Sequence, residues 1–273
     1  MTPSSTRSLF ALACGAVLAA IALAALLAPW IAPYGETALT GGPWEDLSLA
    51  HPLGTDSIGR DLLSRVLFGA RNTIAVALAA TLIAFAIGVT LAFAAAVFAG
   101  WVDQVISRAV DVLMAVPTLI MALVVLSVLG TSIPVLIGVM AVLDSTRVFR
   151  LARALAVDVM ALDFVETARL RGEGFWWFLR REIMPNVAPS LLAEFGLRFS
   201  FAALFLSSLS FLGLGIRPPS ADLGGMVKEN ANAITFGIVA PLVPAAAIAL
   251  IAVCVNALVD WQVRRTTTAG RSP

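Results

Sequence analysis

The sequence has very few of the residues that build metal sites, disulfide frameworks and charged surfaces. Its 273 residues include one histidine and two cysteines, and only 13% are charged, against about a quarter in soluble domains. A lone histidine, His51, cannot supply the several convergent ligands of a zinc site, so we expect it to be a hydrogen-bonding loop residue. Cys14 and Cys254 lie in apolar runs without metal or disulfide spacing, which predicts that both pack as small apolar side chains.

The low charge also excludes nucleic-acid binding. The net charge is +1, and no basic cluster is dense enough to follow a phosphate backbone. What is abundant is apolar surface: 60% of the residues are hydrophobic and the mean hydropathy is +0.95. These values predict an all-α integral membrane protein, because helices satisfy every backbone hydrogen bond within lipid.

Charge-free windows of the length that a bilayer requires, about 20 residues, begin after Arg7, Arg71, Asp111 and Glu229. The window 112–143 is too long for one span, and "GTSIP" at 130–134 is typical of a turn that divides it. We predict six transmembrane helices. They cover 9–32, a stretch after Arg71, 110–129, 133–150, 187–213 and 236–258, with an N-terminus at 1–8, an outer loop at 33–71, a five-helix core at 72–260 and a tail at 261–273.

Two further expectations concern the first span and the orientation. The apolar stretch from Leu9 to Ala32 exceeds the roughly 7–15 residues of a signal-peptide core, so we expect a retained span. With both termini in the cytoplasm, twelve of the eighteen basic residues fall in cytoplasmic segments and five outside, while Arg198 lies in the membrane. This orientation obeys the positive-inside rule.

The segment 57–73 before the second span has apolar residues at every fourth position. Ile58, Leu62 and Val66 form this stripe, and Arg60 and Arg65 lie off it. The pattern predicts an amphipathic helix in the outer interface, and the alternative is a simple extension of the span.

Between the fourth and fifth spans, the arginine- and tryptophan-rich stretch "ETARLRGEGFWWFLRREIMP" predicts two short helices. Asp163 and Glu166 match a capping box, and Gly172 suits the left-handed residue that ends the first helix. Phe175 begins the second helix, which Pro185 is expected to close. Tryptophan and arginine also anchor ordinary helix ends at an interface. A capped helix, a glycine break and an aromatic helix together instead favour docking to a soluble partner.

This stretch resembles the EAA loop of binding-protein-dependent ABC importer permeases. Glu166, Ala168, Gly172 and Pro185 match the pattern of that loop, and Thr167 replaces its middle alanine.

Two further blocks, "HPLGTDSIGRDLLSRVLFGAR" at 51–71 and "LSFLGLGIRPPS" at 209–220, resemble the second permease subunit of the dipeptide, oligopeptide and nickel class. Leu206 stands where relatives carry a glutamate, and Val259 replaces a glycine, so the sequence leaves the substrate open.

The resemblance implies a type I importer permease in the inner membrane that pairs with a homologous permease. It also implies two cytoplasmic ATPases that bind the loop at 151–186, and an external solute-binding protein. ATP and Mg²⁺ would bind in the ATPases and no cofactor in this chain, which has no G-x-x-x-x-G-K-[ST] loop. The residues expected to contact the ATPases are Glu166, Ala168, Gly172, Phe175, Trp176 and Pro185.

Charged residues inside the predicted spans mark candidate positions on a translocation path. Glu194 and Arg198 are four residues apart and share a helix face, where an unpaired charge would be costly in lipid. They either line the path or form a structural pair near the cytoplasmic end. Asp144, three residues before Arg147, is a further path candidate, although its neighbours favour a helix that approaches the inner headgroups.

The sequence thus favours an ATP-driven permease for short peptides or a related solute such as a nickel chelate. An ion-gradient-driven transporter is a second class, but it predicts internal repeats and acidic midplane sites that we do not find. An intramembrane enzyme would need a nucleophile with a base or a metal motif, and neither is present.

Overall fold

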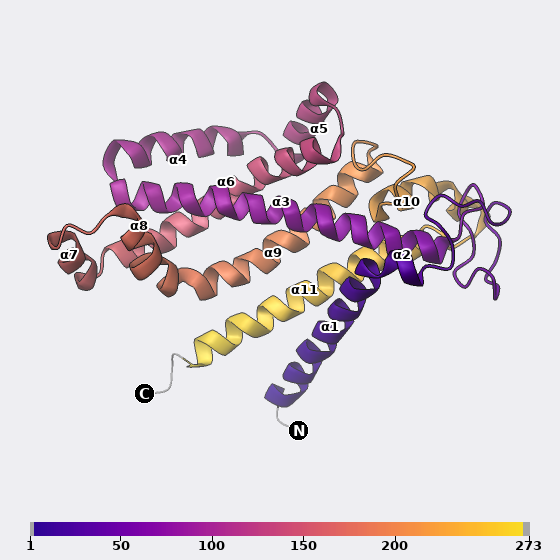
Figure 1. Ribbon diagram of the computed structural model, residues 1–273, viewed down its shortest axis with the longest axis horizontal. Coiled ribbons are helices and arrows are strands. Elements are labelled where there is room, and N and C mark those ends of the chain that lie inside the picture. The colour runs from indigo at the N-terminus through magenta and orange to yellow at the C-terminus, as the bar shows by residue number, and fades with distance from the viewer. Residues whose placement is uncertain (1–2, 270–273) are drawn as a thin grey trace.

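The computed structural model describes residues 3–269, and these form helices without a β-strand (Figure 1). The side chains of residues 3–8, Glu166, Arg169 and 265–269 lie outside the description. The helices are α1 (Pro3–Leu26), α2 (Ala28–Ile31), α3 (Leu62–Phe98), α4 (Gly100–Ala115), α5 (Thr118–Leu129), α6 (Ile133–Met160), α7 (Asp163–Leu170), α8 (Phe175–Trp177), the π-helix η1 (Phe178–Ile183), α9 (Met184–Phe211), α10 (Leu223–Glu229), the 3₁₀-helix η2 (Ala231–Phe236) and α11 (Leu242–Ala269).

The described chain contains four helical segments that are long and apolar enough to cross a bilayer. They are Leu9–Leu26, Leu62–Phe98, Phe175–Phe211 and Leu242–Arg264. The pair α4 and α5 makes a fifth if it is one bent span. α6 has 28 residues, but its segment 133–150 carries three charged residues. The count of six spans therefore stays a prediction, and it depends on whether α6 crosses the membrane.

The third span is not the continuous helix that we predicted for 110–129. α4 and α5 meet at an angle of 86°, because Pro117 lacks a backbone N–H and forces Val116 into an extended conformation with φ −93° and ψ 132°. The turn predicted at 130–134 is confirmed, since α5 ends before Gly130, which has φ +84°, and α6 begins at Ile133.

The separate interfacial helix predicted at 57–73 is also wrong. α3 begins at Leu62, after an N-cap at which the Asp61 carboxylate accepts a 2.8 Å hydrogen bond from the Ser64 backbone N–H. It then continues to Phe98 without a break, which at about 1.5 Å per residue exceeds the roughly 30 Å of hydrocarbon. The alternative, an extension of the span, is confirmed. Arg65 is buried rather than directed to water.

α3 lies at the centre of the bundle and packs most extensively on α6 (Figure 1). A small residue permits this contact: a Cβ on Gly88 would lie 2.7 Å from the backbone oxygen of Ser145 and 2.8 Å from Cβ of Val148. Close backbone approach at small residues is a general way of associating helices in lipid, where water supplies no hydrophobic driving force.

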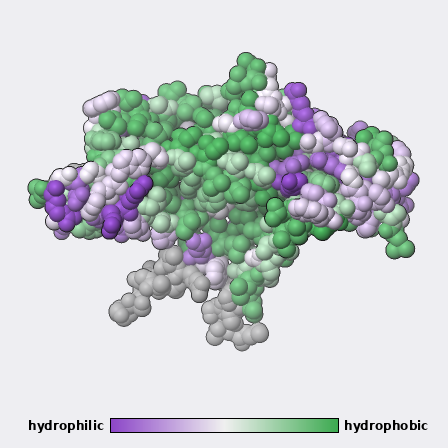
Figure 2. Space-filling view, viewed as in Figure 1, coloured by the Kyte–Doolittle hydropathy of each residue, from purple (hydrophilic) through white to green (hydrophobic). Residues whose placement is uncertain are grey.

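Hydrophilic residues gather at two ends of the molecule, and a broad apolar surface lies between them (Figure 2). One end carries α7 and α8. The other, which we call the cap, consists of loop 32–61 and α10. α1 and α11 converge toward the cap and separate as they extend away from it (Figure 1). An apolar band between polar ends is the arrangement expected of a protein that spans a bilayer.

Candidate functional site

The α7–α8 end is built around a glycine turn, as the sequence predicted. Gly172 has φ +76°, and nothing lies within 4 Å of the position of a Cβ there, so its requirement is conformational. The turn also lets the backbone N–H of Glu173 donate to the carbonyl of Ala168 over 3.4 Å. It reverses the chain between α7 and α8.

The two remaining expectations for α7 have different outcomes. α7 begins at Asp163 itself, whereas an N-cap would precede the helix, and the side chain of Glu166 lies outside the described residues. The capping box therefore stays a prediction. Ala168 is completely buried, together with Val165, in the cluster that covers the ends of α3 and α6. Ala168 therefore acts by holding α7 on the bundle, because its side chain cannot touch a partner.

The aromatic side chains that follow the turn pack against α3 on one side, and one of them, Trp176, is exposed. The ring of Phe175 stacks on Phe98 of α3, with centroids 5.3 Å apart and an interplanar angle of 14°. Trp176 is 62% exposed, and the guanidinium of Arg180 lies 5.7 Å from its ring centroid. Such a cation–π pair keeps the indole beside a positive charge. Leu170, 85% exposed, adds an apolar side chain to this surface.

Pro185 does not close a short helix. α8 continues through η1 directly into α9, so the aromatic segment is the first part of a 37-residue helical stretch that ends at Phe211. Pro185 lies in the first turn of α9 and is exposed. A proline cannot donate the usual helical hydrogen bond, and the wider π-turn before it accommodates that loss without ending the helix.

The three path candidates come together between α6 and α9. Nε of Arg198 donates to Oε1 of Glu194 over 2.5 Å, and its Nη1 lies 3.5 Å from Oδ1 of Asp144. The three side chains are between 13% and 17% exposed. Asp144 therefore turns toward α9 rather than toward headgroups, and one guanidinium serves two carboxylates. This triad therefore has one more carboxyl group than guanidinium groups.

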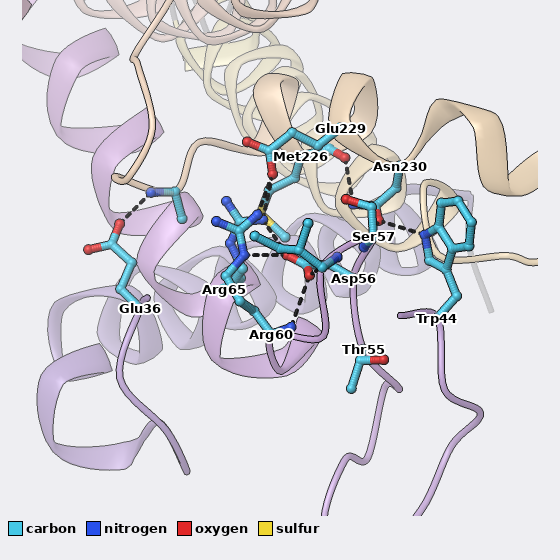
Figure 3. Close-up of polar contacts among 12 residues, drawn as sticks. Glu36, Trp44, Thr55, Asp56, Ser57, Arg60, Arg65, Met226, Glu229 and Asn230 are labelled. Carbon is cyan, nitrogen blue, oxygen red and sulfur yellow. Dashed lines mark hydrogen bonds and ion pairs between the residues drawn. The ribbon is translucent and has the colours of Figure 1, made fainter. Parts of the chain in front are cut away.

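A second cluster of charges, which the sequence did not predict, ties the cap to the bundle (Figure 3). Nη1 of Arg65 lies 2.7 Å from Oδ2 of Asp56 and 2.6 Å from Oε2 of Glu229. Arg60 repeats this bridge: its Nε lies 2.6 Å from Asp56 and its Nη2 2.7 Å from Glu229. The spacing of Asp56 and Arg60 hinted at a pair, but Glu229 is 169 residues from Arg60, so no local signal could include it.

Asp56 is ionised in this cluster because its hydrogen bonds outweigh its burial. Burial raises the pKa of Asp56, whereas backbone N–H groups of Arg60 and Ile58 and the Arg60 guanidinium lower it further, below the ordinary value of 3.8. Beside it, Asn230 accepts from the indole N–H of Trp44 at 3.2 Å and from the backbone N–H of Ser57 at 3.0 Å. The cap is therefore fixed both by charge pairs and by hydrogen bonds to the side-chain amide of Asn230.

His51 takes the structural place that we expected for it. Its Nδ1 lies 3.0 Å from Oδ1 of Asp61, the same carboxylate that caps α3. Among the residues that the structure describes, no three histidine, cysteine, aspartate or glutamate side chains form a group that could hold a metal ion.

Comparison with known proteins adds independent evidence. A family model described as binding-protein-dependent transport system inner membrane component matches residues 88–268. The glutathione transport system permease protein GsiD of Pectobacterium atrosepticum is 32% identical over 260 residues, which are 93% of this chain and 85% of that protein. The dipeptide transport system permease protein DppC of Haemophilus influenzae is 34% identical over 216 residues, 77% of this chain and 73% of that protein.

A solved structure shares the fold. It is described as a crystal structure of an amino acid ABC transporter with histidines, and it superposes with a TM-score of 0.55 at 20% identity, covering 74% of this chain and 94% of its own. The matched family segment contains both the Gly172 turn and the triad of Glu194, Arg198 and Asp144. The chain belongs to the family of inner membrane components of binding-protein-dependent transport systems.

Proposed function

We propose that this permease works in an ATP-driven importer and that the α7–α8 end is where a cytoplasmic ATPase binds. The observation that supports this most directly is the exposed indole of Trp176, held beside Arg180 and backed by the stacked rings of Phe175 and Phe98. Tryptophan and arginine dominate binding hot spots, and a supported ring loses little freedom when a partner covers it.

The orientation follows from the same proposal. The α7–α8 end faces the cytoplasm and the cap faces outward. The first turn of α1 and the last turns of α11 extend away from the cap (Figure 1), which supports cytoplasmic termini. Exposed Arg171, Arg180 and Arg181 add positive charge at the cytoplasmic end, as the positive-inside rule requires.

The complex that we propose contains a homologous second permease, two ATPases and an external solute-binding protein. ATP and Mg²⁺ bind in the ATPases, and this chain transmits their closure through α7 and the long helical stretch that begins at Phe175. Because η1 and α9 continue that stretch, a displacement of Trp176 by the ATPase is transmitted to Glu194 and Arg198 along one continuous helix.

Short peptides are the substrate class that we propose, on the strength of relatives named for glutathione and dipeptide transport. A nickel chelate is the alternative within the same family. An ion-gradient-driven mechanism needs no ATPase, so it would not account for the exposed aromatic surface at the α7–α8 end.

The experiment is a pull-down of the tagged chain in mild detergent, with the co-purifying subunits quantified by mass spectrometry. Trp176→Ala is expected to lower recovery of the ATPases by about tenfold or more, as for a binding hot spot, while the second permease is retained. The matched control is Trp30→Ala on α2, a tryptophan that is 76% exposed at the other end of the molecule.

Trp30→Ala should leave the recovery of both partners unchanged. Equal recovery of ATPases with Trp176→Ala and wild type would remove the α7–α8 end as the binding surface. A wild-type chain that purifies alone and moves solute without ATP would overturn the importer proposal itself.

A further inference from the structure

A cavity of about 420 Å³ opens between α5, α6 and α9, directly beside the triad. Its volume lies within the range of about 300–1,000 Å³ that is usual for small-molecule sites. Asp144 belongs to both features: its Oδ1 faces Arg198, and the residue also lines the cavity. The cavity is therefore adjacent to the charges that the sequence placed on the translocation path.

The polar groups of this cavity carry opposite charges at a fixed spacing. Asp144 and Arg147 are three residues apart on α6 and both line it. Oδ2 of Asp144 is buried without a hydrogen-bond partner, although its other oxygen is paired. The carboxylate therefore has an unused acceptor, and a rotation of the Asp144 side chain would present it to an ammonium group in the cavity. Arg147 is exposed, and its Nη2 donates only to the hydroxyl of Thr118 over 3.2 Å among the contacts described.

The remaining wall is apolar and partly aromatic. Phe201 and Phe205 of α9 line the cavity together with Met140 and Leu143 of α6. The ring of Phe201 lies 5.4 Å below the guanidinium of Arg198, so this wall is continuous with the triad. Aromatic walls favour burial of an uncharged side chain.

We propose that this cavity is a recognition site for a small zwitterion with an apolar side chain, such as a short unblocked peptide. The ammonium group binds the free oxygen of Asp144, the carboxylate binds Arg147, and the side chain lies against Phe201 and Phe205. The inference rests on the proposed function, and it makes the permease itself selective for free peptide ends.

The charge arrangement distinguishes this ligand from the other candidates. A ligand that is only a cation would be repelled by Arg147, and an anionic chelate would be repelled by Asp144. One positive and one negative group three residues apart are matched by a ligand that carries both charges, because each charge of the ligand then forms a charge-assisted hydrogen bond.

The test measures the thermal unfolding of the purified permease–ATPase complex, without binding protein, over a range of concentrations of three probes. The probes are alanyl-phenylalanine, its N-acetyl form without the ammonium group, and its C-terminal amide without the carboxylate. Wild type should be stabilised most by the free dipeptide. Asp144→Asn should weaken its apparent affinity about tenfold while leaving the N-acetyl probe unchanged.

Arg147→Gln should show the reverse selectivity, with about tenfold weaker binding of the free dipeptide and an unchanged effect of the amide. Since Arg147 is exposed, this variant keeps the test decisive if Asp144→Asn does not fold. The matched control is Arg150→Gln on the same helix, an exposed arginine that does not line the cavity; it should bind all probes as wild type does.

Two results would overturn the site: no stabilisation of wild type by the free dipeptide, or equal weakening of all three probes by both variants. ATP-dependent peptide uptake by the wild-type complex in proteoliposomes, with its binding protein, is measured separately. If uptake is intact and the probe selectivity is absent, the cavity proposal fails alone. If uptake does not depend on ATP, the proposed function fails first.

Discussion

The two polar ends of this protein use arginine in opposite ways. Where the cap meets α3, Arg60 of the cap and Arg65 of α3 are 7% and 1% exposed, and each bridges Asp56 and Glu229. At the α7–α8 end, Arg171 and Arg180 are exposed and lie over tryptophan rings at 5.3 and 5.7 Å. Arg60 and Arg65 thus form internal charge pairs, whereas Arg171 and Arg180 remain accessible.

This difference separates a surface that must hold its shape from the one that we propose binds a partner. A buried arginine between two carboxylates fixes three segments of the chain relative to each other, because removing any one of them leaves a charge uncompensated. An arginine over an exposed indole contributes little to stability, yet it presents both groups to a binding partner. A fixed charge network is therefore expected at the cap, and an accessible contact surface at the α7–α8 end.

The largest expected effect breaks the cap cluster. Arg65→Met should destabilise the protein by about 3–5 kcal/mol, because Asp56 and Glu229 would then share the single guanidinium of Arg60 in a buried place. Unfolding of the detergent-solubilised protein by heat or denaturant measures this loss. Adding Glu229→Gln to Arg65→Met should restore part of it, since the excess negative charge is removed.

The matched control for that experiment is Arg150→Gln. Arg150 lies 3.8 Å from Asp111, and the two side chains are 61% and 56% exposed. A solvated pair of this kind contributes less than about 1 kcal/mol. Equal destabilisation by Arg65→Met and Arg150→Gln would show that the cap cluster is not a stabilising unit.

The sequence predicted the features that depend on local chemistry. The Gly172 turn, the break at 130–134 and the place of His51 all follow from single residue types with narrow conformational or hydrogen-bonding preferences. The family motif also located the α7–α8 end, because its glycine spacing is local. These features could be predicted without knowing which residues pack against them from other helices.

The features that it missed depend on residues far apart in the chain. Arg65 falls on the polar side of a four-residue repeat, and its pairing with both Asp56 and Glu229 explains why it is buried. Asp144 looked like part of a basic helix end until Arg198 of α9 was placed opposite it. Pro185 looked like a terminator, but the π-turn before it lets the helix continue. Long-range pairing and helix irregularity leave no periodic signal.

A smaller effect concerns the response of the cap to acid. The pKa of Asp56 lies below its ordinary value of 3.8, so the folded protein holds this proton less tightly than the unfolded chain does. The stabilisation by Asp56 is therefore complete above about pH 4 and is lost as the pH falls through the folded pKa. Pepsin cleavage within residues 33–61, expressed relative to cleavage of an unfolded substrate at the same pH, should stay low at pH 5 and rise toward pH 3.

Asp56→Asn supplies the control, because it cannot titrate. Its cap should be cleaved more readily at pH 5 than that of wild type and should lose the part of the acid response that Asp56 contributes. An acid response that is identical in wild type and Asp56→Asn would assign it to another group and would remove Asp56 from the account.

The smallest effect on stability is expected at the α7–α8 end, from Gly172→Ala. The left-handed backbone of Gly172 costs an alanine about 1–2 kcal/mol, and this cost falls on the turn alone because no neighbour lies within 4 Å of the added methyl group. The unfolding midpoint should change little, while recovery of ATPases in the pull-down should fall several-fold as the aromatic segment loses its position. Gly172→Asn should recover part of that binding, since asparagine tolerates the left-handed region.

Gly138→Ala tests the conformational argument. Gly138 also has open space around it but lies within α6, where alanine is favourable by about 0.5–1 kcal/mol, so ATPase recovery should be unchanged. If Gly172→Ala and Gly138→Ala behave alike in the pull-down, the turn does not position the binding surface, and the contrast between a fixed cap and an accessible α7–α8 end loses its second half.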